Sequence, residues 1–366
     1  MSAQIDALLH DLVSKDASDL HLKVGEPPIM RIRGGLIRAE YPPFSNETLH
    51  AMLWSILTPE RQERLLSFKE LDLSHNVPGL ARFRVNMFWQ RGHLGAVFRV
   101  IPFNIKTIDE LHLPEITKKL ALLPRGLILV TGPTGSGKST SLAAMINHIN
   151  LTKRSHIMTV EDPIEYVHPD KISIINQREL GTDTHTFADA LKHVMRQNPD
   201  VILVGEMRDL ETIQLAITAA ETGHLVMSTL HTVDAPQTID RVVDVFSPDQ
   251  QAQVRTQISV TLQAVISQTL LPTKDGLGRV AAFEVMTATP AIRTLIRDGK
   301  THQLYLDIQT GAEMGMQTLD SCLLNLLIEK KIDYEQALSK CSNAADFSKR
   351  AMNQGLVEAV TTHAAD

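Results

Sequence analysis

The feature that most constrains this chain is the stretch Gly132–Thr140, here called the P-loop, which fits the pattern G-x-x-x-x-G-K-[ST] without a mismatch. The run Gly126–Thr131 before it is short and apolar, which is typical of a buried parallel strand, and residues 138–149 after it read as a helix. Strand, glycine-rich loop and helix in this order form the context of a phosphate-binding loop. The alternative is a glycine turn that only joins a strand to a helix.

Each residue type of the P-loop has a physical task in binding a nucleoside triphosphate. Glycines let backbone N–H groups turn inward around phosphate oxygens, and the dipole of the following helix favours their negative charge. We expect Lys138 to reach the β- and γ-phosphates and the Ser139 hydroxyl to bind Mg²⁺. The predicted nucleotide-binding residues are Gly132, Pro133, Thr134, Gly135, Ser136, Gly137, Lys138, Ser139 and Thr140.

Length and composition narrow the class of protein. A chain of 366 residues suggests two or three domains, and a net charge of −6 argues against a protein that coats nucleic acid. No apolar run approaches a membrane-spanning length and no signal-peptide pattern opens the chain, so a cytoplasmic protein is expected. The two cysteines, Cys322 and Cys341, lack a C-x-x-C spacing, which excludes a cysteine zinc knuckle and fits a reducing compartment.

The first hundred residues predict a separate α+β domain. An amphipathic helix opens it, and two hairpins follow over residues 29–38 and 82–100. Residues 102–114 carry two prolines and little periodicity, so they are expected to lie extended on the surface as a linker.

Beyond residue 120 the pattern alternates strand and helix, which predicts a parallel α/β sheet with its ligand at the carboxyl edge. Apolar runs at residues 156–160, 201–204 and 225–229 read as strands. A helix is expected from a capping box at Ser247 to about Ser267, followed by an antiparallel hairpin over residues 268–271 and 279–285. Helices are expected from Pro290 to about Lys340, and the last twenty residues read as loosely ordered.

Hydrolysis needs a group that activates water, a metal ion and charge neutralisation on the phosphoryl group. The strand at residues 201–204 runs into Gly205 and Glu206, an apolar strand that ends in an acid beside the P-loop strand. Glu206 is our candidate for the general base, although Gly205 stands where an Asp is usual. The alternative is an acid that only precedes the helix beginning near Asp209.

Two further groups follow strand ends. The carboxylates of Glu161, Asp162 and Glu165 could hold Mg²⁺ through water, unless they form only a solvated acidic turn. His231 follows the third strand and could place an imidazole near the γ-phosphate, although a lone histidine is more often structural.

The second hairpin of the first domain has an unusual charge distribution. No Asp or Glu occurs between Asp72 and Asp109, whereas that interval contains Arg82, Arg84, Arg91, Arg99 and Lys106. Some of these arginines could face an anion, and the triphosphate is the anion that the sequence indicates. A solvated face of a sheet is the alternative.

Four ordered segments, residues 132–140, 159–165, 200–209 and 223–232, resemble the Walker A, Asp-box, Walker B and His-box motifs of the type II/type IV secretion ATPases. The Gly-Glu ending of the third is that family's usual form. Residues 18–22 and 291–300 are similar to segments of the branch that retracts type IV pili, except that the family usually has Asn at Thr294 and Glu at Asp298. Extension ATPases are longer and carry a four-cysteine zinc motif, which this chain lacks.

The resemblance implies an ATP-hydrolysing, Mg²⁺-dependent homohexamer that powers pilus retraction and twitching motility. Arg84 and Arg99 match, by their place in the hairpin, arginines that the N-terminal domain contributes to the nucleotide. The implied partners are an inner-membrane platform protein and a paralogous retraction ATPase, with no nucleic acid and no membrane insertion, at the cytoplasmic face of the inner membrane. The implied α/β fold comprises a PAS-like domain (1–101), a linker (102–114), a RecA-like ATPase core (115–286), a helical bundle (287–345) and a flexible tail (346–366).

Three alternatives stay open at this stage. RecA-like ATPases include helicases and nucleic-acid translocases. A chain with only 4% aromatic residues, however, has few side chains on which bases could stack. A regulatory GTPase is a second alternative, but no N-K-x-D motif is visible. An accessory retraction paralogue is the third.

Overall fold

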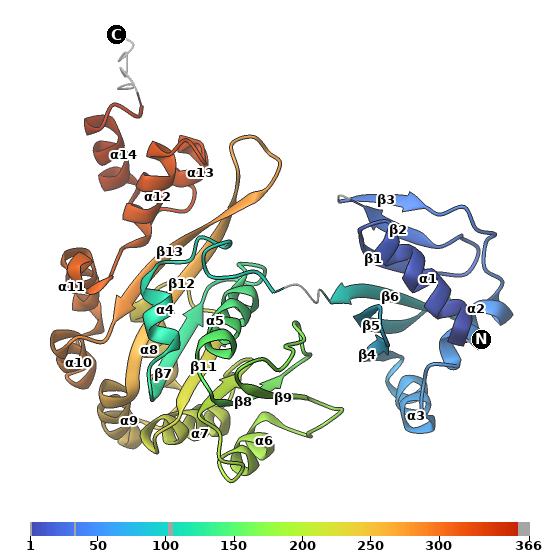
Figure 1. Cartoon of the computed structure of the whole chain (residues 1–366). Helices are drawn as coiled ribbons and strands as arrows, with labels where there is room; N and C mark the ends of the chain where they lie inside the picture. Colours follow the sequence, from blue (N-terminus) through green and yellow to red (C-terminus); the bar gives the residue numbers. More distant parts are fainter. Residues whose placement is uncertain (1, 33, 102–104, 358–366) are drawn as a thin grey trace. The chain divides into compact units, whose positions relative to one another are not determined.

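The computed structural model describes residues 2–32, 34–101 and 105–357, and its contacts divide the chain into two compact units (Figure 1). The first unit comprises Met1–Asn104 together with Pro163–His168, and the second comprises Ile105–Asp162 together with Pro169–Asp366. Each unit has its own apolar core. The two units are described separately below.

The first unit is an antiparallel sheet with helices packed on one face. The strand order is β3-β2-β1-β6-β5-β4. The strands are β1 (Ala17–Leu22), β2 (Ile29–Ile32), β3 (Gly35–Arg38), β4 (Glu70–Val77), β5 (Ala81–Gln90) and β6 (His93–Ile101). The helices α1 (Ser2–Ser14), α2 (Asn46–Trp54) and α3 (Pro59–Phe68) share one core with the sheet. Alternation along β5 buries Phe83, Val85 and Met87 in that core and turns Arg84 to the opposite face.

The second unit is a three-layer α/β structure around a seven-stranded sheet of order β13-β12-β7-β11-β10-β8-β9. Every neighbouring pair is parallel except β12 with β13. The strands are β7 (Gly126–Thr131), β8 (His156–Glu161), β9 (Ile174–Glu179), β10 (Val201–Val204), β11 (Leu225–Leu230), β12 (Leu262–Pro272) and β13 (Arg279–Thr287). Because the central strands are buried on both faces, they read in the sequence as continuous apolar runs.

Helices cover both faces of this sheet (Figure 1). One face packs against α4 (Ile116–Ala121) and α5 (Lys138–Thr152). The other packs against α6 (Phe187–Val194), α7 (Leu210–Glu221), α8 (Ala235–Asp244), α9 (Pro248–Thr261) and α10 (Pro290–Arg297). The chain continues through η1 (Thr301–Gln303), α11 (Leu304–Thr310), η2 (Ala312–Met314), α12 (Leu319–Ile328), α13 (Tyr334–Leu338) and α14 (Ala344–Asn353). Among the described residues, no helix is both long and apolar enough to span a bilayer.

Three local predictions are wrong. The helix expected to reach about Ser267 ends at Thr261, because the following residues form β12 between β7 and β13, and the Ser247 hydroxyl makes no capping bond to the backbone. The expected linker does not lie extended on the surface, because Ile108 and Leu113 are buried in the second unit. The last segment is not uniformly loose, because Phe347 and Ala351 anchor α14 in a core. Residues 102–104 and 358–366 lie outside the described residues.

Candidate nucleotide-binding and hydrolysis site

The P-loop joins the end of β7 to the beginning of α5. Gly137 caps the helix with a φ of +91°, a left-handed conformation that glycine adopts at little cost. The Lys138 ammonium donates to the carbonyl oxygens of Gly132 and Pro133, at 2.8 and 3.1 Å. The side chain therefore bends back over the loop, and the hydroxyl of Ser136 is buried with no hydrogen-bond partner among the described residues. A donor-rich loop with an unpaired buried hydroxyl is suited to an oxygen-rich anion.

Glu206 and His231 meet beside Lys138, although they follow the ends of different strands. Nε2 of His231 is 3.0 Å from Oε1 of Glu206, and Nδ1 is 3.5 Å from the Lys138 nitrogen. An ammonium only donates and an ionised carboxylate only accepts, so a neutral imidazole protonated on Nε2 satisfies both contacts. The two strands are neighbours, because β10 pairs with β11 in parallel register. The structure thus brings together three of the residues predicted from the sequence.

Arg208 is a neighbour of the site that the sequence did not single out. Its guanidinium donates to Oε2 of Glu206 at 2.7 Å. Burial by itself would raise the pKa of Glu206, but the hydrogen bond and positive charge of Arg208, together with the contact with His231, outweigh burial, and the pKa is lowered. Glu206 is therefore ionised near neutral pH, as a base must be. The position of Arg208, two residues after Glu206, is the sequence feature that could have identified it.

Gly205 has a steric reason to be glycine. A Cβ at this position would lie 3.2 Å from the Glu161 Cα and 3.2 Å from the Val160 carbonyl oxygen. The end of β8 would therefore crowd the side chain of the aspartate that is usual there. His224, by contrast, is structural, since it lies at the opposite end of β11 from His231 and contacts the carbonyl oxygen of Ala219 at 2.9 Å.

The three acidic residues after β8 are not gathered around one point of this unit. Thr159 and Gln177 donate to Oε1 of Glu161, at 2.6 and 3.1 Å. Glu165 belongs to the segment Pro163–His168, which clusters with the first unit. Within the described ranges, no group of three or more His, Cys, Asp or Glu side chains is arranged to hold a metal ion. Mg²⁺ does not require such a group, because it usually takes one or two protein oxygens and completes its shell with phosphates and water.

In the first unit, Arg84 and Arg99 are neighbours on β5 and β6, on the face of the sheet away from the core. Arg84 is exposed, and Arg99 is 66% exposed although its Nε donates to Oδ1 of Asp19 at 2.8 Å. Asp19 itself is 3% exposed. Burial would raise its pKa, but hydrogen bonds from Ser18 and Arg99 outweigh burial and lower it. The carboxylate of Asp19 thus orients Arg99 on this face.

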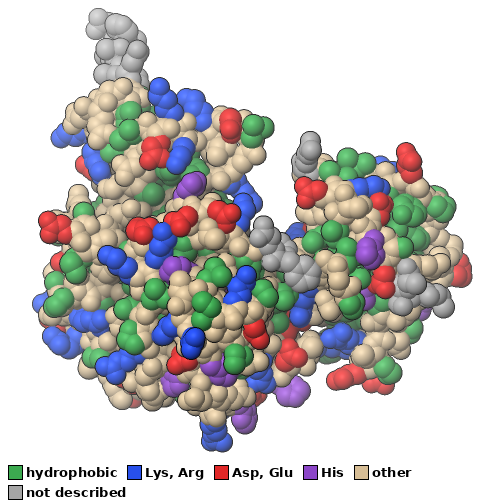
Figure 2. Space-filling model, in the orientation of Figure 1, with side chains coloured by type: hydrophobic (Ala, Val, Ile, Leu, Met, Phe, Trp, Pro, Cys, Tyr) green, Lys and Arg blue, Asp and Glu red, His purple; other side chains and the backbone are tan. Residues whose placement is uncertain are grey.

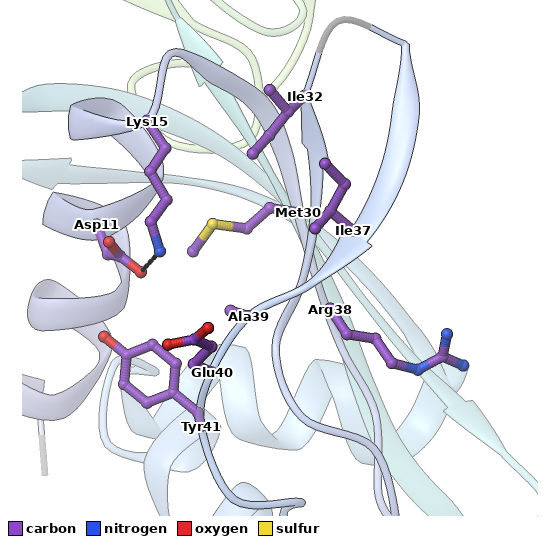
Figure 3. A pocket seen from close by; sticks show the side chains of 9 residues that line it. All are labelled: Asp11, Lys15, Met30, Ile32, Ile37, Arg38, Ala39, Glu40 and Tyr41. Atoms are coloured by element: carbon purple, nitrogen blue, oxygen red, sulfur yellow. Dashed lines mark hydrogen bonds and ion pairs between the residues drawn. The ribbon is translucent and has the colours of Figure 1, made fainter.

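A separate cavity of about 550 Å³ lies in the first unit, between α1, the β2–β3 hairpin and the segment after β3 (Figure 3). Met30 and Ile37 line it together with charged side chains. Both of its cations are already paired, Lys15 with Asp11 at 2.7 Å and Arg38 with Glu26 at 3.0 Å. These pairs make the cavity a poor anion site, and it lies in a different unit from the P-loop.

The largely parallel sheet with helices on both faces, the P-loop between β7 and α5, and an acid and a histidine after the ends of adjacent strands define a RecA-like P-loop ATPase. The predicted fold class is confirmed. Residues 82–286 match the family model described as Type II/IV secretion system protein, and the chain belongs to this family.

Individual relatives narrow the comparison. The chain is 52% identical over 343 residues to the type IV pilus retractation ATPase PilT of Pseudomonas aeruginosa, which covers 94% of this chain and 99% of that protein. It is 42% identical over 344 residues to the type IV pilus ATPase PilU of the same organism, with 94% and 90% covered. The crystal structure of the pilus retraction motor PilT with bound ADP matches with a TM-score of 0.87 and 45% identity, covering 93% of this chain and 98% of that one. The resemblance to pilus retraction ATPases is confirmed.

Proposed function

We propose that this chain is an ATP-hydrolysing motor that powers type IV pilus retraction and hence twitching motility. The observation that carries the proposal is the match to PilT over nearly the full length of both chains. The retraction assignment also draws on α10 and the residues after it, which form the segment Ala291–Lys300.

The segment Ala291–Lys300 is anchored in the second unit by buried side chains and hydrogen bonds. Ile292 and Ile296 are fully buried, and the Arg293 guanidinium donates to the carbonyl oxygens of Ser259 and Val260, both at 2.7 Å. These carbonyls belong to the last turn of α9, where a cation satisfies otherwise unpaired acceptors. Arg297, one helical turn after Arg293, is exposed, and its Nε lies 4.0 Å from the carboxylate of Asp298.

For the chemistry, we assign Glu206 as the general base that accepts a proton from the attacking water. In the structure, His231 contacts one oxygen of the Glu206 carboxylate and Arg208 donates to the other. The site therefore becomes competent when one of these contacts opens. We infer that Lys138 exchanges the carbonyl oxygens of Gly132 and Pro133 for the phosphates, and that His231 transmits this movement to Glu206.

The remaining site residues have supporting roles. The backbone of the P-loop holds the phosphates, and Mg²⁺ would be held by Ser139 with help from Glu161, Asp162 or Glu165. When bound, the ion would supply positive charge to the phosphate groups. Arg84 and Arg99 would neutralise charge on the transferring phosphoryl group, a role worth about 10³–10⁵ in rate in other phosphoryl-transfer enzymes.

We propose that the active form is a homohexamer in which the N-terminal domain supplies these arginines to the nucleotide. The division into a PAS-like N-terminal domain, a RecA-like ATPase core and a C-terminal helical bundle is part of this proposal. ATP binding and hydrolysis would drive rotations between the domains and act on an inner-membrane platform protein at the cytoplasmic face. A PilU-like paralogue is a further proposed partner, and the higher identity to PilT than to PilU favours the main motor over an accessory one.

The competing function is a nucleic-acid translocase. On the face drawn in Figure 2, basic and acidic side chains are intermingled over both units, which does not favour a phosphate-backbone track. ATPase activity that single-stranded DNA stimulates several-fold, with a strong salt dependence, would establish this alternative instead.

The deciding experiment is cellular. A deletion strain should keep its pili, in normal or excess number, but fail to retract them and to twitch. The wild-type gene and a Lys153→Ala control, at the other end of α5, should restore retraction, whereas Lys138→Ala should not because it removes nucleotide binding. A deletion strain without pili would assign the chain to assembly and overturn the proposal.

A further inference from the structure

Gln268 lies on β12, far from the P-loop in sequence but beside it in the fold. The preceding residue, Ser267, pairs in register with Thr131 at the end of β7, and the two hydroxyls are 2.8 Å apart. Gln268 is 4% exposed. The strand pairing therefore delivers this side chain to the start of the phosphate-binding loop.

The amide of Gln268 connects the loop to the first turn of α5. Its Nε2 donates a short hydrogen bond to the carbonyl oxygen of Ser136, and its Oε1 accepts from the Ser141 hydroxyl at 2.7 Å. A hydroxyl donor on one side and a carbonyl acceptor on the other allow only one orientation of the amide. Both partners are buried, so neither bond is readily replaced by water.

Gln268 also explains why two P-loop positions are glycine. A Cβ at Gly132 would overlap the backbone carbonyl oxygen of Gln268, and a Cβ at Gly137 would lie 2.8 Å from its Nε2. Both glycines also have positive φ, at +139° and +91°. The first and last glycines of the motif thus pack against a single residue of another strand.

The bond to Ser136 has a consequence for phosphate binding. In a planar trans peptide, C=O and N–H point in opposite directions, so holding the Ser136 carbonyl toward β12 turns the Gly137 N–H away from it. Backbone N–H groups at this point of a P-loop form the phosphate cradle. We infer that Gln268 is a positioning residue that holds the phosphate-binding loop in its binding-ready shape. The inference rests on the proposed hydrolytic site, but not on the work that hydrolysis drives.

The test is a set of substitutions in the full-length protein, with binding measured by a fluorescent ADP analogue and Mg²⁺, and hydrolysis by steady-state kinetics. Gln268→Glu cannot donate to Ser136 and adds negative charge beside the phosphates. The Kd for the ADP analogue and the KM for ATP should therefore both rise about tenfold or more. Ser141→Ala, which removes only the orienting partner, should raise both about two- to threefold. Gln263→Glu makes the same chemical change on the same strand, away from the loop, and should stay within twofold.

The kinetics distinguish positioning from a merely structural role. A positioning role raises KM and Kd more than it lowers kcat, and leaves the melting temperature without nucleotide close to that of the wild type. A Kd within twofold of wild type for Gln268→Glu, or a fall in kcat at unchanged KM, would overturn the inference. Should Gln268→Glu fail to fold, an unchanged Kd for Ser141→Ala would overturn it equally. Because affinity is measured on the purified protein, a failure here is separate from a failure to retract pili.

Discussion

Replacing Glu284 by Gln should stabilise the second unit relative to the wild type. This stabilisation should be larger at high pH than at low pH. Glu284 lies on β13, is 2% exposed and accepts a hydrogen bond from the backbone N–H of Ala235 at 2.8 Å. Burial raises the pKa of its carboxyl from 4.5 to about 7, and the nearby charges of Asp234 and Asp320 add to this effect. Gln keeps an oxygen for the Ala235 N–H but cannot ionise.

The magnitude and its sign follow from the difference between the folded and unfolded pKa. Between pH 4.5 and about 7, the folded protein holds a proton that the unfolded chain has lost, so its stability falls as the pH rises through this window. A difference of about 2.5 pKa units corresponds to about 3 kcal/mol, fully developed above pH 7 and absent below pH 4.5. The advantage of Glu284→Gln should therefore grow by about this amount from pH 4.5 to pH 8.

The assay can separate the two units of the chain. Both tryptophans, Trp54 and Trp89, lie in the first unit, so tryptophan fluorescence follows that unit during unfolding. Scanning calorimetry from pH 4.5 to 8.5 should show a pH-dependent shift in the melting temperature of the second unit in Glu284→Gln. The transition that tryptophan fluorescence follows should be unchanged. Glu313→Gln, in the exposed η2 turn, is the matched control and should show no pH-dependent shift. Wild-type and Glu284→Gln stabilities that run parallel across this range would refute the reasoning.

Two further predictions concern hydrolysis. Glu206→Gln should keep nucleotide affinity within a few-fold but lower kcat by about 10²–10⁴, since a general base contributes on that order; turnover at the wild-type rate would remove Glu206 from this role. Arg84→Ala and Arg99→Ala should each slow ATP hydrolysis by the assembled protein without unfolding the first unit, which tryptophan fluorescence can verify. Arg99→Ala should also reduce that unit's stability, because it removes a partner of the buried Asp19, whereas Arg38→Ala on the β3 edge is a control expected to retain full turnover. Unchanged turnover in both arginine variants would exclude them from the site.

Much of the candidate site was predictable because its signals are local. The P-loop is one continuous segment in which each residue type follows from the backbone shape that phosphate requires. The strand that ends at Glu206 is apolar throughout because both of its faces are buried, so its end could be located from the sequence. The alternation of such strands with helices was sufficient to predict the parallel α/β class.

The tertiary structure decided which distant residues meet. Strand register alone places His231 between Lys138 and Glu206, and Gln268 against a carbonyl 132 residues away. Crowding by the end of β8 explains the glycine before Glu206.

The dependence on distant partners also explains why some local predictions of secondary structure were wrong. The residues after Thr261 are β12 and not helix because β7 and β13 supply their backbone partners, and a local pattern cannot reveal such partners. The sequence by itself therefore determined the backbone that binds phosphate and the class of fold around it. The contacts that hold and adjust this backbone depend on long-range packing, which only the folded chain defines.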